Sequence, residues 1–165
     1  MPYDFNANEI FEMAIRIEEN GAAFYRKAAA LQSDAKNQDF LKKIAAMEDQ
    51  HKVIFERMRK DVTAAEKNAT VFDPQHELGQ YLSAMADSHG GEGSPTAAEA
   101  LTGSETMAEI ITTAIGLEKE SILFYVGLRD FVPPESGRAK LDDIIKEERK
   151  HVIQLDTLLK KIAAS

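Results

Sequence analysis

Apolar side chains recur at helical spacing in four long stretches of the chain. The stretches cover residues 8–31, 34–66 and 105–131, and a last one begins near Pro134 and Glu135. Hydrophobic residues return every three or four positions in each, which predicts amphipathic helices with one buried face. Candidate N-cap residues precede three of them: Asn6 or Asn8, Ser33, and Ser104. The pattern therefore predicts an all-α chain.

The connections between these helices differ in length. Residues 32–33 and residues 132–134 form short loops, and short loops join antiparallel neighbours. The middle connection, residues 67–103, is long and contains one further helical pattern at residues 74–86. A long connection inside a compact domain needs a reason, and a crossover along a helix bundle supplies one. We therefore predict a single domain over residues 1–165, a four-helix bundle of two hairpins joined by a crossover.

The two halves of the sequence repeat each other at a shift of 100 residues. Residues 17–25 align with residues 117–125, and both segments carry a Glu in second place and end in Phe-Tyr. A Glu-x-x-His motif follows in each half, at residues 48–51 and 148–151, with the same shift and no gap. One such motif means little in a helical protein, but two at a fixed offset are much less expected by chance. The repeat indicates two copies of one hairpin related by a pseudo-two-fold axis.

Six polar residues of this repeat fall inside the apolar stripes. They are Glu18, Glu48, His51, Glu118, Glu148 and His151. The two Glu residues of the first hairpin lie 14 and 15 residues from the loop at residues 32–33, or about 21–23 Å along their helices. The second hairpin repeats this spacing, and each His shares a helix face with the Glu three residues before it. All six side chains are expected at one level of the bundle.

The negative charge of four carboxylates at one buried level has to be balanced by nearby positive charge. Burying an ionised carboxylate without a partner costs several kcal/mol, and no Lys or Arg lies in the stripes at this level. Two divalent cations would supply the opposite charge, and two neutral imidazoles would complete the ligation. The competing interpretation, six solvated surface residues, would turn the apolar stripes outward. The sequence thus predicts a two-metal site, for which iron or manganese is the best match and zinc an alternative.

Composition and charge restrict the possible binding partners, cofactors and location of the protein. The net charge of −8 disfavours nucleic acid, which requires a basic face. The absence of cysteine excludes disulfides and Cys-bound iron–sulfur clusters within these residues. No apolar run is long enough to span a membrane, and the first twelve residues do not have the pattern of a signal peptide, so a cytoplasmic location is expected. His76 and His89, in the crossover, lack paired spacing and are interpreted as surface residues.

The ligand pattern resembles that of a known family. A Glu on each of two helices, with Glu-x-x-His on each of the other two, is the set found in ferritin-like di-iron carboxylate proteins. The Phe-Tyr pair six and seven residues after the upstream Glu resembles rubrerythrin, and the likeness covers about residues 6–163. It implies a ferritin-like bundle with two iron ions bridged by Glu48 and Glu148. Glu18 and Glu118 would be terminal ligands, and each His would bind one metal.

The resemblance also implies a function. It is that of a di-iron oxidoreductase that reacts with hydrogen peroxide or dioxygen. Because the sequence has no cysteine for a rubredoxin-like iron, electrons are expected from a separate donor protein or small reductant, and we also expect a homodimer. Tyr25 and Tyr125 would hydrogen-bond near the site, with core packing as their alternative role. Other functions left open are ferrous iron oxidation or iron handling, a dimanganese catalase-like site, and a non-enzymatic bundle that binds partners.

The chain departs from the rubrerythrin pattern in two respects. Rubrerythrins usually carry a further carboxylate one turn after the ligand of the third helix, where this chain has Ser121, and Gly21 in the first half. No cysteine is present to form a rubredoxin-like iron site. Glu147, next to Glu148, matches an acidic position in the motif of di-iron proteins, but we interpret it as an exposed side chain.

Overall fold

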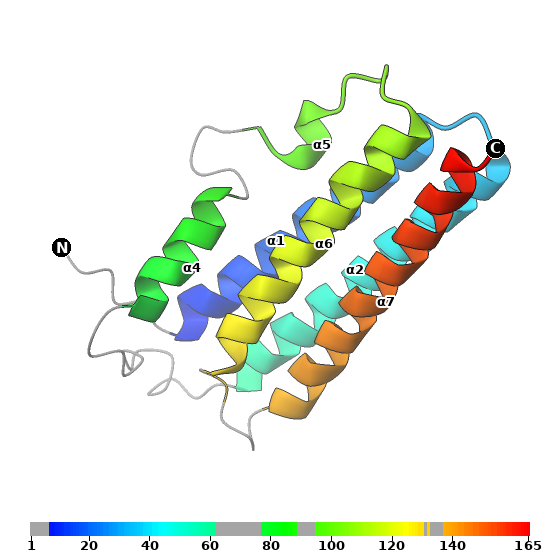
Figure 1. Ribbon diagram of the computed structural model, residues 1–165. Helices are drawn as coiled ribbons and strands as arrows, with labels where there is room; N and C mark the ends of the chain where they lie inside the picture. Colours follow the sequence, from blue (N-terminus) through cyan, green and yellow to red (C-terminus); the bar gives the residue numbers. More distant parts are fainter. Residues whose placement is uncertain (1–6, 62–76, 89–94, 131, 133–136) are drawn as a thin grey trace.

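Four long helices lie side by side in the computed structural model, which describes residues 7–61, 77–88, 95–130, 132 and 137–165. They are α1 (Ala7–Ala30), α2 (Ala35–Asp61), α6 (Met107–Arg129) and α7 (Arg138–Ala163). α1 packs against α2, and α6 against α7, as two antiparallel hairpins (Figure 1). The predicted all-α bundle of two hairpins is confirmed.

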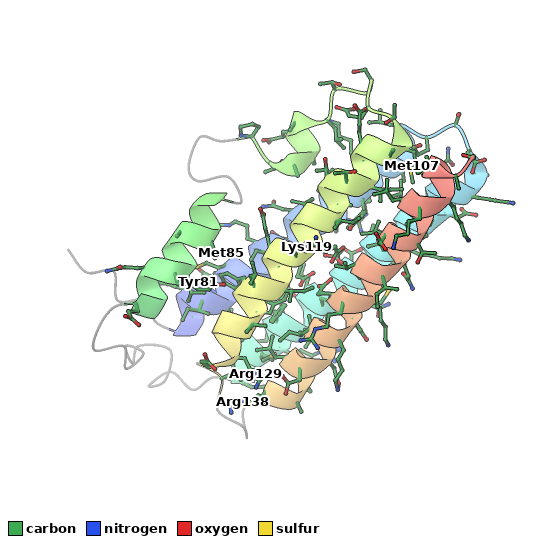
Figure 2. All side chains as sticks on the ribbon, in the orientation of Figure 1. Tyr81, Met85, Met107, Lys119, Arg129 and Arg138 are labelled. Carbon is green, nitrogen blue, oxygen red and sulfur yellow. The ribbon has the colours of Figure 1, made fainter. Side chains whose placement is uncertain are left out.

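Two shorter helices belong to the crossover. α4 (Glu77–Ser88) lies against α6 and corresponds to the helix predicted at residues 74–86, of which residues 74–76 lie outside the described part. α5 (Ala97–Ala100), which we did not predict, lies against α1 (Figure 1). Tyr81 and Met85 occupy the side of α4 that faces the bundle (Figure 2), and the Tyr81 hydroxyl donates to the Leu123 carbonyl at 3.0 Å. The crossover is thereby fixed to the bundle at two levels.

The start of α6 differs from the prediction. Thr106, not Ser104, is the N-cap, and it forms a capping box with Glu109. The Thr106 hydroxyl accepts from the Glu109 backbone N–H at 3.2 Å, and the Glu109 carboxylate accepts from the Thr106 N–H at 2.7 Å. Two otherwise unpaired N–H groups are satisfied at once, which is why this position prevails over Ser104.

Other helix ends also differ from the prediction. At the start of α2 the Asp34 carboxylate accepts from the Asn37 backbone N–H at 3.0 Å, so Asp34 rather than Ser33 is the cap. Asn8 lies inside α1, and Asn6 lies outside the described residues. α7 begins after Gly137, whose φ of 111° is a left-handed conformation that glycine adopts without strain. Residues 62–66 and 133–136, where other ends were predicted, are not described.

The core consists of two apolar clusters at opposite ends of the bundle. One contains Phe11, Phe55, Leu128 and Leu141, and the other contains Phe24, Leu41, Ile110 and Leu155, each with further aliphatic neighbours. The layer between them is formed by residues near position 18 of α1 and its counterparts on the other helices. Among the described helices, none combines the length and the apolar character that crossing a membrane requires.

Candidate metal centre

Six buried polar side chains meet between the two apolar clusters. α1 contributes Glu18, α2 contributes Glu48 and His51, α6 contributes Glu118, and α7 contributes Glu148 and His151. Each of them is at most 4% exposed. The structure brings together all six residues that the repeat predicted, and it places them in the interior rather than on solvated faces.

Their ligand atoms form two groups that share members. The first group is Glu18, Glu48, His51 and Glu148, and the second is Glu48, Glu118, Glu148 and His151. Within each group the candidate ligand atoms lie within 4.8 Å of one another. Glu48 and Glu148 occur in both groups, which is the arrangement required of bridging carboxylates. Each group takes three ligands from one hairpin and one from the other.

Both imidazoles turn the same nitrogen toward the carboxylates. His51 Nδ1 lies 3.0 Å from Glu148 Oε1 and 3.6 Å from Glu18 Oε2. His151 Nδ1 lies 3.0 Å from Glu148 Oε2 and 3.5 Å from Glu118 Oε2. Glu148 therefore faces one imidazole with each of its oxygens. In both rings Nδ1 is the candidate ligand atom, and Nε2 points away from the cluster.

The two Nε2 atoms have different partners. His51 Nε2 lies 2.6 Å from the Glu147 carboxylate, whereas His151 Nε2 lies 3.3 Å from the sulfur of Met47. The Glu147 side chain is 41% exposed, but its carboxylate also reaches across from α7 to the imidazole on α2, a contact that we did not predict. The acidic position of the di-iron motif is the signal in the sequence that could have identified this contact.

Two tyrosines link the hairpins at the same level. The Tyr25 hydroxyl donates to Glu118, and the Tyr125 hydroxyl donates to Glu18, so each tyrosine holds the carboxylate of the opposite hairpin. Burial, followed by the nearby carboxylate charges, raises the pKa of both phenols well above the ordinary value. Both therefore stay protonated and act as donors. Tyr25 and Tyr125 are buried among apolar neighbours as well, so both predicted roles occur together.

Burial dominates the charge state of the carboxyl groups. Loss of hydration raises the pKa of Glu118 to about 8, and it raises the pKa of Glu18 and of Glu48 as well. Burial acts in the same direction on Glu148, but the hydrogen bond with the His151 imidazole and the close approach of the His51 imidazole outweigh it and hold the pKa of Glu148 below its ordinary value. Glu148 is thus the carboxylate that stays ionised between two cationic rings.

Burial has the opposite effect on the pKa of the imidazoles. Burial on its own lowers the pKa of an imidazole, but the adjoining carboxylates prevail and raise the pKa of His51 to about 11 and that of His151 to about 9. Without metal, the cluster therefore keeps protons on both rings. Metal ions would replace these protons as the positive charges among the carboxylates.

Unpaired atoms in the cluster match what metal ions require. Glu18 Oε2, Glu48 Oε1, His51 Nδ1 and Glu148 Oε1 are buried and have no partner in hydrogen-bond geometry. A buried polar atom without a partner is costly in a folded protein. All four atoms belong to residues of the first ligand group, and two of these residues, Glu48 and Glu148, also belong to the second. Oxygen-rich ligation with one imidazole for each metal fits iron or manganese, so the residues present fit a two-metal centre.

A cavity of about 30 Å³ adjoins the cluster on the side of α1 and α6. Its polar lining comes from Asn20, Tyr25, Glu48, Glu118 and Ser121, and Ala97 of α5 contributes to the wall. The residue one turn beyond Glu118 is Ser121 rather than a carboxylate, and its hydroxyl donates to the Leu117 carbonyl of the same helix, 3.0 Å away.

Gly21 packs directly against the carboxylate of Glu48. A Cβ at this residue would lie only 2.7 Å from Oε2 of Glu48. Gly21 and Ser121, the two departures from the rubrerythrin pattern, both line the cavity beside the candidate ligands. His76 and His89, interpreted as surface residues, lie outside the described residues.

Comparisons with known proteins agree with this geometry. A sequence model of the family described as Rubrerythrin matches residues 9–159. A solved structure from Thermotoga maritima, titled as a ferritin-like diiron-carboxylate protein, is similar over 97% of this chain and 98% of its own, with a TM-score of 0.70 and 21% identity. At that identity the likeness shows the fold, a ferritin-like bundle. The comparison with curated proteins found no match.

Proposed function

The chain belongs to the rubrerythrin family, and on this basis we propose that its buried cluster is a di-iron oxidoreductase centre that reacts with hydrogen peroxide or dioxygen. Two bound iron ions would supply two electrons by passing from the ferrous to the ferric state, the number that converts one hydrogen peroxide and two protons into two water molecules. The observation that carries the proposal is that Glu48 and Glu148 belong to both ligand groups, because shared carboxylates hold two ions close enough to act together.

The two tyrosines hold the terminal carboxylates in a fixed orientation before any reaction, which supports the proposed function. Tyr25 and Tyr125 keep their protons and fix Glu118 and Glu18 from across the hairpin interface. A terminal carboxylate oriented in this way does not need to be reorganised when charge changes at the centre. We therefore assign both tyrosines the task of orienting ligands, in the protonated form.

The size of the cavity supports a small oxidant. Its volume of about 30 Å³ leaves room for one or two water-sized molecules beside Glu48 and Glu118. Hydrogen peroxide and dioxygen have two heavy atoms each and match this space. The Ser121 hydroxyl and the Asn20 amide line the same space and offer hydrogen bonds to a polar guest.

The source of electrons stays a prediction. The sequence has no cysteine with which to bind a rubredoxin-like iron, so we propose a separate donor protein or small reductant. Homodimer formation and a cytoplasmic location likewise stay predictions.

Metal analysis followed by oxidant titration tests the proposed function. Protein purified without oxygen should contain close to two iron ions per chain after loading with ferrous iron. Addition of hydrogen peroxide or dioxygen to the reduced protein should change its ultraviolet–visible spectrum. The zinc-loaded protein is the control and should show no change. Absence of any change in the iron-loaded protein with either oxidant would overturn the proposal.

The same titration separates the alternative functions. Repeated turnover of ferrous iron added under air would assign the centre to iron oxidation or iron handling. Release of dioxygen from peroxide by the manganese-loaded protein would indicate catalase-like chemistry.

A further inference from the structure

The two halves of the cluster differ at one pair of residues that face the imidazoles. Under the shift of 100 residues, the six candidate ligands and both tyrosines have counterparts of the same type. Residue 47 is the counterpart of residue 147, and here the chain has Met47 in the first half and Glu147 in the second. Each of these side chains meets the Nε2 atom of the imidazole on the opposite hairpin.

The difference affects how strongly each ring binds metal. An imidazole that ligates through Nδ1 carries its remaining proton on Nε2 and donates it to an acceptor. Glu147 gives His51 a carboxylate acceptor at 2.6 Å, which fixes the tautomer and increases the electron density at Nδ1. Met47 gives His151 a thioether at 3.3 Å, and thioether sulfur is a weak acceptor. His51 is therefore the better supported ligand.

From this asymmetry we propose that the two metal positions are unequal, and that the position ligated by His51 fills before the position ligated by His151. Loss of a hydrogen-bond partner of a metal-bound His typically lowers metal affinity by about 10–100-fold. The Glu147 side chain is 41% exposed, which weakens its effect, so we expect the lower end, about tenfold. The proposal concerns affinity for any divalent metal at this centre and goes beyond the redox function proposed above.

Stepwise binding alone does not test the proposal. Two ions that share Glu48 and Glu148 repel each other, so even a symmetric centre would bind the second ion more weakly. The test has to identify which position fills first and has to change the partner of each imidazole separately. Zinc is the suitable probe because it is redox-inert and binds carboxylate and imidazole.

The experiment combines anomalous diffraction with zinc titration. Crystals of the protein with one equivalent of zinc should show higher occupancy beside His51 than beside His151. The Glu147→Gln variant keeps the shape of the side chain but weakens the acceptor, and it should lose about tenfold in affinity for the first zinc. Met47→Glu gives His151 the acceptor that His51 has, and it should tighten the second binding step and reduce the difference in occupancy.

Each outcome decides the proposal. Equal occupancy in the wild-type protein, or higher occupancy beside His151, would overturn it, as would unchanged first-step affinity in both Glu147→Gln and Glu147→Leu. A Glu147→Leu variant, with circular dichroism to confirm folding, repeats this test if Glu147→Gln retains a hydrogen bond through its amide oxygen. Absence of zinc binding by the wild-type protein would overturn both the ordering and the metal centre. Two bound zinc ions with the predicted ordering, together with no oxidant reaction of the iron form, would retain this proposal and reject only the redox function.

Discussion

Replacement of Gly21 by alanine tests whether the position of Glu48 is set by metal. The new Cβ would lie 2.7 Å from Oε2 of Glu48, but 3.5 Å from Cδ and 3.7 Å from Cγ. Only the oxygen is too close, and it must retreat by about 0.7 Å to reach the 3.4 Å of an ordinary contact. Rotation of the terminal carboxylate is a soft motion, because torsions of this kind are broad.

The consequences differ between the metal-free and the loaded protein. Without metal the carboxylate can rotate, and alanine in place of glycine inside a helix contributes about 1 kcal/mol of stability. With metal, bonds to carboxylate oxygen are about 2.0–2.2 Å long, so the same retreat breaks or strains the contact with a shared ligand. We expect a loss of at least about tenfold in metal affinity, which corresponds to about 1.4 kcal/mol.

Gly116→Ala is the matched control. Gly116 is exposed on α6, and a Cβ there would meet nothing within 4 Å. Urea unfolding in the presence of a chelator should show both variants at least as stable as the wild type, and zinc competition titration should show lost affinity in Gly21→Ala alone. Wild-type affinity in Gly21→Ala would refute the assignment of Glu48 as a shared ligand. A metal-free Gly21→Ala protein less stable than the wild type by more than about 1 kcal/mol would show that protein contacts, not metal, fix Glu48.

Three further changes probe other parts of the centre. Tyr125→Phe removes the hydroxyl that donates to Glu18, and it should lower the free energy of unfolding in urea by about 1–3 kcal/mol, because a buried acceptor loses its donor. An unchanged unfolding midpoint would contradict this hydrogen bond. Ala97→Leu should fill the cavity and slow the reaction of the reduced iron protein with peroxide in stopped-flow measurements, while Ala100→Leu, on the exposed side of the same short helix, should react at the wild-type rate. The metal-free protein should lose thermal stability as pH rises from 6.5 to 9, because its folded state holds protons more tightly than its unfolded state. Folding raises the pKa of Glu118 from 4.5 to about 8 and the pKa of His151 from 6.5 to about 9. Metal-loaded protein, in which ions have replaced these protons, should not show that loss, and a metal-free melting temperature that rises over this range would contradict the charge states described above.

The metal centre could be predicted from the sequence because the spacing of its candidate ligands is the same in both halves of the chain. The 100-residue shift and the two Glu-x-x-His motifs define helix faces and distances from the loops, and those are properties of a regular helix. The same reasoning missed Glu147, since a residue next to a buried Glu on a helix is expected to turn outward. Its contact with His51 depends on how α7 and α2 approach each other, which periodicity does not encode.

The short elements were predicted less well, for a related reason. α5 has only four residues, too few for a periodic pattern, and its signal is the capping box of Thr96 and Glu99. A cap of the same kind at Thr106 was overlooked in favour of Ser104. In both cases the decisive residue is the Glu at the third helical position, which pairs with the cap and distinguishes it from other hydroxyl residues nearby.

The crossed bonds of Tyr25 and Tyr125 have a consequence for how a duplicated sequence can drift. Because each hairpin orients the carboxylate of the other, a change in one copy immediately damages the ligand set of its twin. Within the cluster, the two copies are therefore free to diverge at the residues around the ligands rather than at the ligands, and the pairs Met47 with Glu147 and Gly21 with Ser121 are such differences. Two initially identical metal positions would thus first become different through changes in the residues that touch the ligands. The ligands themselves stay the same in both halves, because each hairpin depends on the other to orient its carboxylate.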